Sequence, residues 1–163
     1  MKTLFIIRHA KSSWDDPSQS DIDRPLNERG KRDAPVMASR LVNKKLEIEL
    51  FISSPAKRAK KTAMIFAEAF GVKEKKIELV ESLYEAAPEA FFKVVEHLSD
   101  DYNSAAIFSH NPGITGFVNM LTDQLVPNMP TCAVFAVKAA IKNWSEFRSA
   151  KKELLLFDYP KSD

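Results

Sequence analysis

Cysteine and glycine are both scarce in this chain. Its 163 residues include one cysteine, Cys132, and four glycines. A single cysteine excludes an intramolecular disulfide and a cysteine-rich zinc site, and it is typical of a protein in a reducing compartment such as the cytoplasm. The chain also lacks internal repeats, low-complexity tracts and a glycine-serine linker. We therefore expect one continuous domain over residues 1–163.

Neither sign of charge dominates, and long apolar runs are missing. Lysine and arginine total 24 against 22 aspartate and glutamate, which gives a formal net charge of +2. The basic excess of a nucleic-acid-binding protein is absent, so any affinity for anions must come from local clusters of cations. The apolar run at residues 4–7 is too short for a signal peptide, and no run approaches the roughly 18 residues of a membrane helix. We expect a soluble cytoplasmic protein that binds neither nucleic acid nor a membrane.

Short apolar runs alternate with helical patterns along the chain. Strands are predicted at residues 3–7, 50–52, 77–80, 105–108, 133–137 and 154–157, and helices at about 28–45, 56–70, 88–98 and 112–121. The alternation predicts an α/β fold, a three-layer α/β/α sandwich around a mostly parallel sheet. The last two strands, which are close in sequence, are candidates for an antiparallel edge. Pro35 falls inside the first helix and predicts a kink or a late start.

Polar side chains follow three of the predicted strands directly. The first strand runs into Arg8 and His9, the second into a Ser-Ser-Pro turn followed by Arg58, and the fourth into His110. Ligands of open α/β sheets bind at the carboxyl ends of the strands. Each of these side chains alone has an ordinary structural explanation. Their coincidence at one edge of the sheet indicates a site.

This combination of side chains suits phosphoryl transfer. The guanidinium groups of Arg8 and Arg58 match the charged oxygens of a phosphoryl group. A neutral imidazole of His9 is able to attack phosphorus and form a covalent phosphohistidine, and nearby cations favour the neutral ring. No metal ion or cofactor is needed. The rival hypothesis, a divalent ion held by His9, His110 and a carboxylate such as Asp15, places a dication beside two permanent cations, which is unfavourable.

Four motifs surround these residues in order along the chain: Arg8-His9-Ala10, Asp23-Arg24-Pro25-Leu26-Asn27 with Gly30, Ser53-Ser54-Pro55 through Arg58-Ala59 and Thr62-Ala63, and Ser109-His110-Asn111-Pro112-Gly113. Together they resemble the histidine phosphatase superfamily, which has a phosphoglycerate mutase-like fold, and within it the SixA-type phosphohistidine phosphatases. The resemblance implies that His9 is the nucleophile and that Arg8, Arg58 and His110 bind the phosphoryl group. It also implies a substrate protein that carries phosphohistidine, either a phosphotransfer domain or a carrier protein.

A general acid is the least defined part of the resemblance. Phosphomonoesterases of the superfamily place this acid after the third strand, where Glu85 is the nearest counterpart and Glu81 the alternative. An imidazole leaving group needs a proton less than an alkoxide does, so a phosphohistidine phosphatase tolerates a weak acid or none. A general small-molecule phosphomonoesterase is therefore the second hypothesis, and a non-catalytic phospho-binding module is the third.

Several further residues carry structural interpretations. We expect Cys132 in the core, and His97 either at the surface or capping the end of a helix. The pair Asp21 and Asp23 is expected in a loop or at the entry to a helix. Trp14 either edges a substrate groove or anchors its loop against the sheet.

Overall fold

The strands form one mixed sheet. The structure is a computed structural model that describes residues 1–161. The six strands lie in the spatial order β3-β2-β4-β1-β5-β6. The first four strands in sequence are parallel to one another, whereas β5 is antiparallel to both β1 and β6, which confirms the antiparallel edge. Their bounds are β1 (Lys2–Arg8), β2 (Leu50–Ser53), β3 (Glu78–Leu79), β4 (Ser104–Ser109), β5 (Val134–Ala139) and β6 (Glu153–Asp158).

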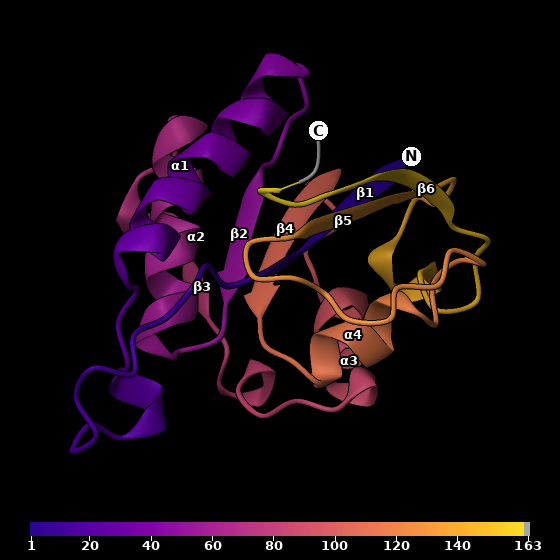
Figure 1. Cartoon of the computed structure of the whole chain (residues 1–163). Helices are drawn as coiled ribbons and strands as arrows, with labels where there is room; N and C mark the ends of the chain where they lie inside the picture. Colours follow the sequence, from indigo (N-terminus) through magenta and orange to yellow (C-terminus); the bar gives the residue numbers. More distant parts are fainter. Residues whose placement is uncertain (162–163) are drawn as a thin grey trace.

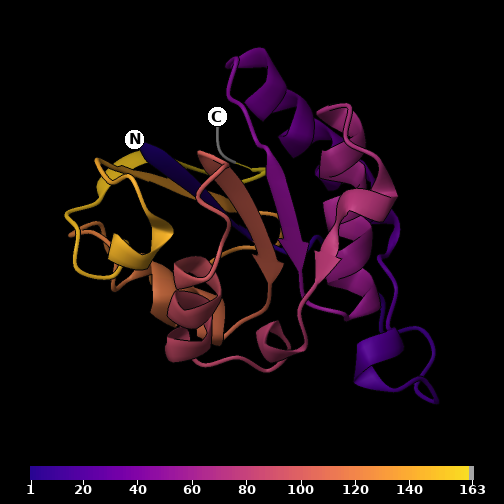
Figure 2. The ribbon, with the colours of Figure 1, turned by 180° about the vertical axis from the view of Figure 1, so that it is seen from behind.

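Helices cover both faces of this sheet and complete the predicted three-layer sandwich. Helices α1 (Glu28–Asn43) and α2 (Lys57–Ala69) pack on one face, and α3 (Pro88–Glu96) and α4 (Gly113–Val118) on the other (Figures 1 and 2). Within residues 1–161, no helix has both the length and the apolar character that crossing a membrane requires. Four 3-10 turns complete the described structure: η1 (Asp21–Asp23), η2 (Glu74–Lys76), η3 (Glu81–Leu83) and η4 (Trp144–Glu146).

The apolar run of β1 forms the centre of the core. Because successive side chains of a strand point to opposite faces, Leu4 and Ile6 pack in the cluster on the α3 and α4 side. Phe5 and Ile7 pack in the cluster on the α1 and α2 side. All four side chains are fully buried. A continuous apolar run is thus what a central strand covered on both faces requires.

Helix α1 begins where its cap predicts and contains Pro35 in its interior. The side chain of Asn27 accepts a hydrogen bond from the backbone N–H of Gly30 (2.9 Å), so the helix begins at Glu28. The prediction of a late start at Pro35 is wrong. The proline removes one backbone donor, but the buried face around it, which includes Met37 and Leu41, keeps the helix in place.

The strands end level with one another at the carboxyl edge of the sheet. Arg8, the last residue of β1, pairs with Ser109, the last residue of β4, and Ser53 of β2 pairs with Phe108 of β4. The residues that follow these three strands therefore emerge side by side. The segment that carries η1 projects beyond this edge (indigo, lower left in Figure 1).

Candidate active site

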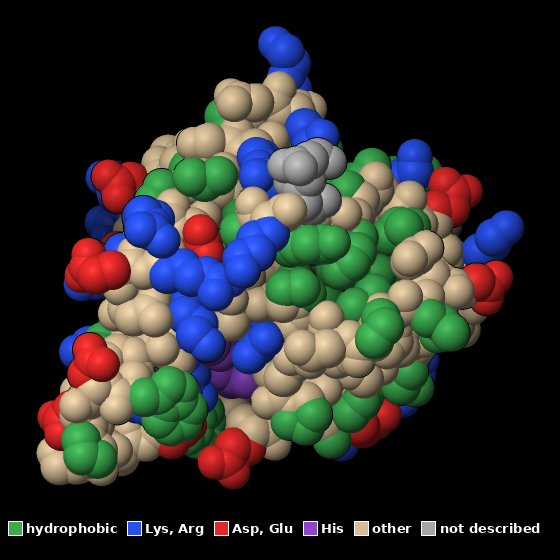
Figure 3. All heavy atoms as spheres, in the orientation of Figure 1, with side chains coloured by type: hydrophobic (Ala, Val, Ile, Leu, Met, Phe, Trp, Pro, Cys, Tyr) green, Lys and Arg blue, Asp and Glu red, His purple; other side chains and the backbone are tan. Residues whose placement is uncertain are grey.

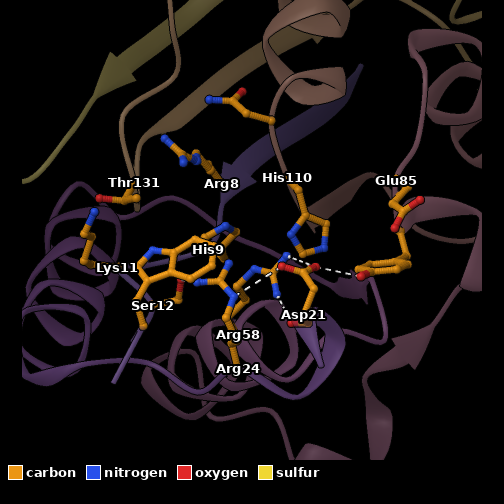
Figure 4. A pocket seen from close by; sticks show the side chains of 13 residues that line it. Arg8, His9, Lys11, Ser12, Asp21, Arg24, Arg58, Glu85, His110 and Thr131 are labelled. Atoms are coloured by element: carbon orange, nitrogen blue, oxygen red, sulfur yellow. Dashed lines mark hydrogen bonds and ion pairs between the residues drawn. The ribbon is translucent and has the colours of Figure 1, made fainter. Parts of the chain in front are cut away.

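A pocket of about 290 Å³ opens at the carboxyl ends of β1, β2 and β4. All five predicted site residues line it, although they come from four separate segments of the chain (Figure 4). The space-filling view shows histidine at the floor of a hollow, with lysine and arginine side chains gathered beside it (Figure 3). The lining residues are Arg8, His9, Lys11, Ser12, Trp14, Asp21, Arg24, Arg58, Tyr84, Glu85, His110, Asn111 and Thr131.

His9 lies just past the end of β1 and is 6% exposed. Its Nδ1 is 2.7 Å from the carbonyl oxygen of Ala10. A carbonyl oxygen only accepts, so Nδ1 carries the hydrogen and Nε2 keeps its lone pair. Burial, with smaller effects from His110 and the cations Arg8 and Arg58, lowers the pKa of His9 to about 3. The ring is therefore neutral near neutral pH, with one nitrogen ready to act as a nucleophile.

The backbone around His9 is held from two directions. The N–H of Ala10 donates to Thr62 Oγ1 on α2 (3.0 Å). On the other side, the N–H of Cys132 donates to the carbonyl oxygens of Arg8 (3.1 Å) and His9 (3.0 Å). Cys132 is fully buried, as predicted, and burial raises the pKa of its thiol. These contacts fix the nucleophile on a rigid part of the fold.

Two guanidinium groups enter the pocket from β1 and α2. Arg8 Nη1 donates to the carbonyl oxygen of Met129 (2.8 Å). Arg58 donates from Nη1 to the carbonyl oxygen of Asp21 (2.6 Å) and from Nη2 to its carboxylate oxygen Oδ2 (2.9 Å). Burial and the charge of Arg58 lower the pKa of Arg8 from its high ordinary value. Arginine nevertheless stays charged at neutral pH, so Arg8 and Arg58 each contribute a permanent positive charge to the pocket.

His110 faces His9 from the end of β4. The two ring centroids are 5.2 Å apart. His110 Nε2 is 2.7 Å from Ser54 Oγ, which also accepts the N–H of Ala56 (3.2 Å). Among the described residues, His110 is the one acceptor for the Ser54 hydroxyl, which places the remaining ring hydrogen on Nδ1. Burial, followed by the charge of Arg58, lowers the pKa of His110 to about 3, so this ring is also neutral.

Buried polar atoms without a hydrogen-bond partner concentrate in this pocket. The described residues contain four such side-chain atoms, and three of them are Arg8 Nε, Arg58 Nε and His110 Nδ1. The fourth is Asp33 Oδ2. An unsatisfied buried donor costs about 1–3 kcal/mol. Three donors collected around one nucleophile indicate a site for an anion, which would offset this cost.

The structure separates the two candidates for a general acid. Glu85 is exposed, lines the pocket and has a positive φ of 54°, whereas Glu81 is exposed and does not line it. The loop that carries Glu85 is held closely against the start of α4, because a Cβ atom on Gly113 would lie 1.8 Å from the carbonyl oxygen of Ala86. Glu85 is thus the acidic side chain after β3 that lines the pocket.

Asp21 and Tyr84 are pocket residues that the sequence analysis missed. Asp21 lies in the 3-10 turn η1, consistent with the expected loop position, but its carboxylate also contacts Arg58 and accepts a hydrogen bond from Tyr84 (2.6 Å). Partial burial raises the pKa of Asp21, but the hydrogen bonds from Tyr84 and Arg58 outweigh it and bring this pKa down to about 2. The one sequence feature that could have indicated Asp21 as a pocket residue is the high density of polar residues between residues 11 and 23.

Trp14 lies at the rim of the pocket. Its side chain is 72% exposed, and the guanidinium carbon of Arg24 lies 3.5 Å from the ring centroid. Arg24 is itself fixed by a hydrogen bond to Ser12 Oγ (2.9 Å). The exposed indole therefore does not anchor its loop against the sheet, and that it edges a substrate groove stays a prediction.

The remaining sequence interpretations concern metal ligands and His97. Asp15 does not line the pocket with the two histidines. Within residues 1–161, no group of three or more histidine, cysteine, aspartate or glutamate side chains is placed to hold a metal ion. His97 caps the end of α3 and donates from Nδ1 to the carbonyl oxygen of Lys93 (2.7 Å), as predicted.

Sequence comparison gives a family match and named relatives. The model of the histidine phosphatase superfamily (branch 1) matches residues 4–107, a span that contains His9 and Arg58 and ends just before His110. An uncharacterised chloroplastic protein of Arabidopsis thaliana is 30% identical over 154 residues, which cover 89% of this chain and 70% of that protein. Phosphoserine phosphatase 1 of Hydrogenobacter thermophilus is 36% identical over 111 residues, 59% of this chain and 52% of that one.

Solved structures show the same fold over nearly the whole chain. The SixA protein of Agrobacterium tumefaciens superposes with a TM-score of 0.83 at 23% identity and covers 98% of both chains. The protein histidine phosphatase SixA in complex with tungstate superposes with a TM-score of 0.81 at 24% identity and covers 97% of both chains. At these identities the likeness describes the fold.

Proposed function

Because the chain belongs to the histidine phosphatase superfamily, we propose that it removes phosphoryl groups from phosphohistidine on another protein, either a phosphotransfer domain or a carrier protein. The chain is a phosphatase of this superfamily, and the proposal concerns its substrate and the roles of its residues. The observation that carries the proposal is the hydrogen bond from His9 Nδ1 to Ala10, which leaves a neutral, unprotonated Nε2 in a pocket that Arg8 and Arg58 also line. A module that only binds phosphate has no use for a nucleophile prepared in this way.

In the first step, the lone pair of His9 Nε2 forms a bond to phosphorus while the phosphorus–nitrogen bond of the substrate breaks. The electron pair of that bond goes to the departing imidazole, which takes a proton from Glu85 or from solvent. Arg8, Arg58 and the Nδ1–H of His110 donate hydrogen bonds to the phosphoryl oxygens, where charge is stabilised in a largely buried pocket.

In the second step, water attacks the phosphorus of the phosphohistidine on His9. The bond between phosphorus and Nε2 breaks, its electron pair returns to the ring, and a proton of the water leaves with the phosphate product or passes to solvent. Because Nδ1 stays bonded to Ala10 throughout, the ring returns to the same tautomer and is ready for the next substrate.

The surroundings of the pocket support a substrate on a protein surface. Glu85 and Trp14 are both exposed at the rim, and Glu85 accepts no hydrogen bond from the described residues. A general acid that is not held in place by hydrogen bonds suffices for an imidazole leaving group, because imidazole is easier to expel than an alkoxide. The fold shared with the protein histidine phosphatase SixA supports the same assignment.

A general phosphomonoesterase is the second candidate function. Two observations favour it: Glu85 lines the pocket where an acid would protonate an alkoxide, and a curated relative is a phosphoserine phosphatase at 36% identity. Measuring kcat/KM for a phosphohistidine-bearing phosphotransfer protein and for phosphoserine under the same conditions separates the two. The proposal requires the phosphoprotein to be the better substrate, and a preference for phosphoserine would replace it with the esterase.

Two substitutions test the roles of the histidines. His9→Ala should abolish both turnover and the acid-labile label left by a radioactive phosphoryl donor. His110→Asn should slow turnover by about two to three orders of magnitude, the usual effect of losing one donor to a developing oxyanion, yet still trap label on His9. Label that persists in His9→Ala and disappears in His110→Asn would reverse the two roles.

A further inference from the structure

We propose that Asp21 is a positioning residue that holds the guanidinium of Arg58 in the orientation required by the phosphoryl group. The inference rests on the role of Arg58 in the proposed function, and it does not depend on whether the donor is phosphohistidine or a phosphoester. Asp21 lies 37 residues before Arg58 in the sequence, in the 3-10 turn η1, so the sequence around either residue does not predict the contact.

Asp21 accepts two hydrogen bonds from the guanidinium of Arg58. Its carbonyl oxygen accepts from Nη1 at 2.6 Å and its carboxylate Oδ2 accepts from Nη2 at 2.9 Å (dashed lines in Figure 4). A guanidinium has five N–H donors in one plane, so three remain after these two bonds: one on each Nη and the Nε–H. Fixing two donors of a planar group fixes the direction of the other three. The remaining donors are therefore aimed before any substrate arrives.

The carboxylate of Asp21 is itself fixed by other side chains. Tyr84 donates from its hydroxyl to Oδ2 at 2.6 Å, and Arg24 donates from Nε to Oδ1 at 3.2 Å. Hydrogen bonding to Asp21 also raises the pKa of Tyr84 to about 12, which keeps the phenol protonated as a donor. Both carboxylate oxygens thus have partners from different segments of the pocket wall. The side chain of Asp21 is 48% exposed, but its contact with Arg58 belongs to a hydrogen-bond network and is not an isolated ion pair.

The alternative is that Asp21 competes with the phosphoryl group for Arg58. A competing carboxylate would have to move away from Arg58 when the phosphoryl group binds. One of the two hydrogen bonds to Arg58, however, is accepted by the backbone carbonyl of Asp21. The Asp21 carboxylate is also held by hydrogen bonds from Tyr84 and Arg24. Arg58 is 6% exposed in its side chain, so it also lacks room to turn toward a new partner. These contacts indicate that Asp21 keeps its hydrogen bonds to Arg58 during turnover.

The test is a double-substitution cycle with a neighbouring control. Asp21→Ala should lower kcat by about tenfold or more, because a displaced guanidinium donates poorly in the transition state, while KM changes by less than about threefold. Asp23→Ala is the control, since Asp23 lies in the same turn, and its side chain accepts from Ser20 and does not contact Arg58. The control should leave kinetics unchanged. In the Arg58→Lys background, Asp21→Ala should have little further effect, because the planar group that it positions is already gone.

Three results would overturn the proposal. A higher kcat or tighter inhibition by inorganic phosphate in Asp21→Ala would show that the carboxylate competes with the phosphoryl group. An undiminished Asp21→Ala effect in the Arg58→Lys background would show that it acts independently of Arg58. An equal loss in Asp23→Ala would show that the turn, and not the carboxylate, matters. All measurements use the phosphoryl donor that wild type hydrolyses best, so a wild type that prefers phosphoserine contradicts the proposed substrate and leaves this test intact.

Discussion

Gly30 offers a sharp test of how closely the fold supports the nucleophile. It lies in the first turn of α1, and a Cβ atom added to it would sit 2.2 Å from the carbonyl oxygen of Lys11. Ordinary contact begins at 3.4 Å, so Gly30→Ala must push the Lys11 backbone away by about 1 Å. Lys11 is two residues after His9, and its carbonyl also accepts the N–H of Asn27 (3.0 Å). The displacement therefore acts directly on the segment that holds the nucleophile.

Two physical effects predict opposite outcomes for Gly30→Ala. Helix propensity alone predicts stabilisation of about 1 kcal/mol, whereas a backbone clash predicts destabilisation of about 1–3 kcal/mol. A misplacement of about 1 Å near reacting groups costs about 100-fold in rate. We expect a lower free energy of unfolding in urea and a fall in kcat/KM of that order.

Gly71→Ala is the matched control for Gly30→Ala. Gly71 has a φ of 72° and no atom within 4 Å of its added Cβ, so the substitution should cost about 1–2 kcal/mol of stability through backbone strain and leave turnover unchanged. A Gly30→Ala enzyme that is both more stable than wild type and fully active would refute the argument from the Lys11 contact.

Three other predictions concern the charges of the pocket. Turnover should survive treatment with a chelator, because Arg8 and Arg58 neutralise the phosphoryl charge in the proposed mechanism; loss of activity with rescue by a divalent ion would contradict this. Arg58→Lys should lower kcat about 100-fold, since lysine keeps the charge and loses the planar set of donors, and near-normal kinetics would remove Arg58 from the site. Because the folded-state pKa of both His9 and His110 is about 3, below the ordinary 6.5, the unfolded state binds protons more readily, and the free energy of unfolding should fall as the pH drops from 6.5 toward 3. Replacing both histidines by asparagine should flatten that fall in urea titrations, and an unchanged pH dependence would contradict the low pKa values.

The sequence was most informative where one strong physical requirement decided the local structure. Central strands buried on both faces need continuous apolar runs, so β1 and β4 were predicted within a residue or two at each end. Parallel strands also bring their carboxyl ends together, which made it possible to predict that His9, Arg58 and His110 share one pocket.

The sequence was least informative about contacts set by the path of loops. Asp21 reaches Arg58 because the segment after β1 turns back over α2, and no periodicity encodes that turn. Ser54 was recognised only as part of the Ser-Ser-Pro motif, yet its hydroxyl determines which nitrogen of His110 carries the hydrogen. At Pro35 only the predicted late start was wrong, because the cap at Asn27 and the buried face of α1 decide where the helix begins.

The place of β4 between β2 and β1 has a consequence for the order in which the enzyme matures on the ribosome. Strands β1 and β2 are synthesised first but are not neighbours, and they are joined in the sheet only through β4. The backbone N–H of His9 bonds to Ser109, and the N–H of Ser54 bonds to Phe108. Arg8 finds its partner later still, at Met129. A nascent chain that ends before β4 therefore carries His9 without these contacts, and we expect phosphatase activity to arise late in translation, once the chain beyond Met129 has left the exit tunnel.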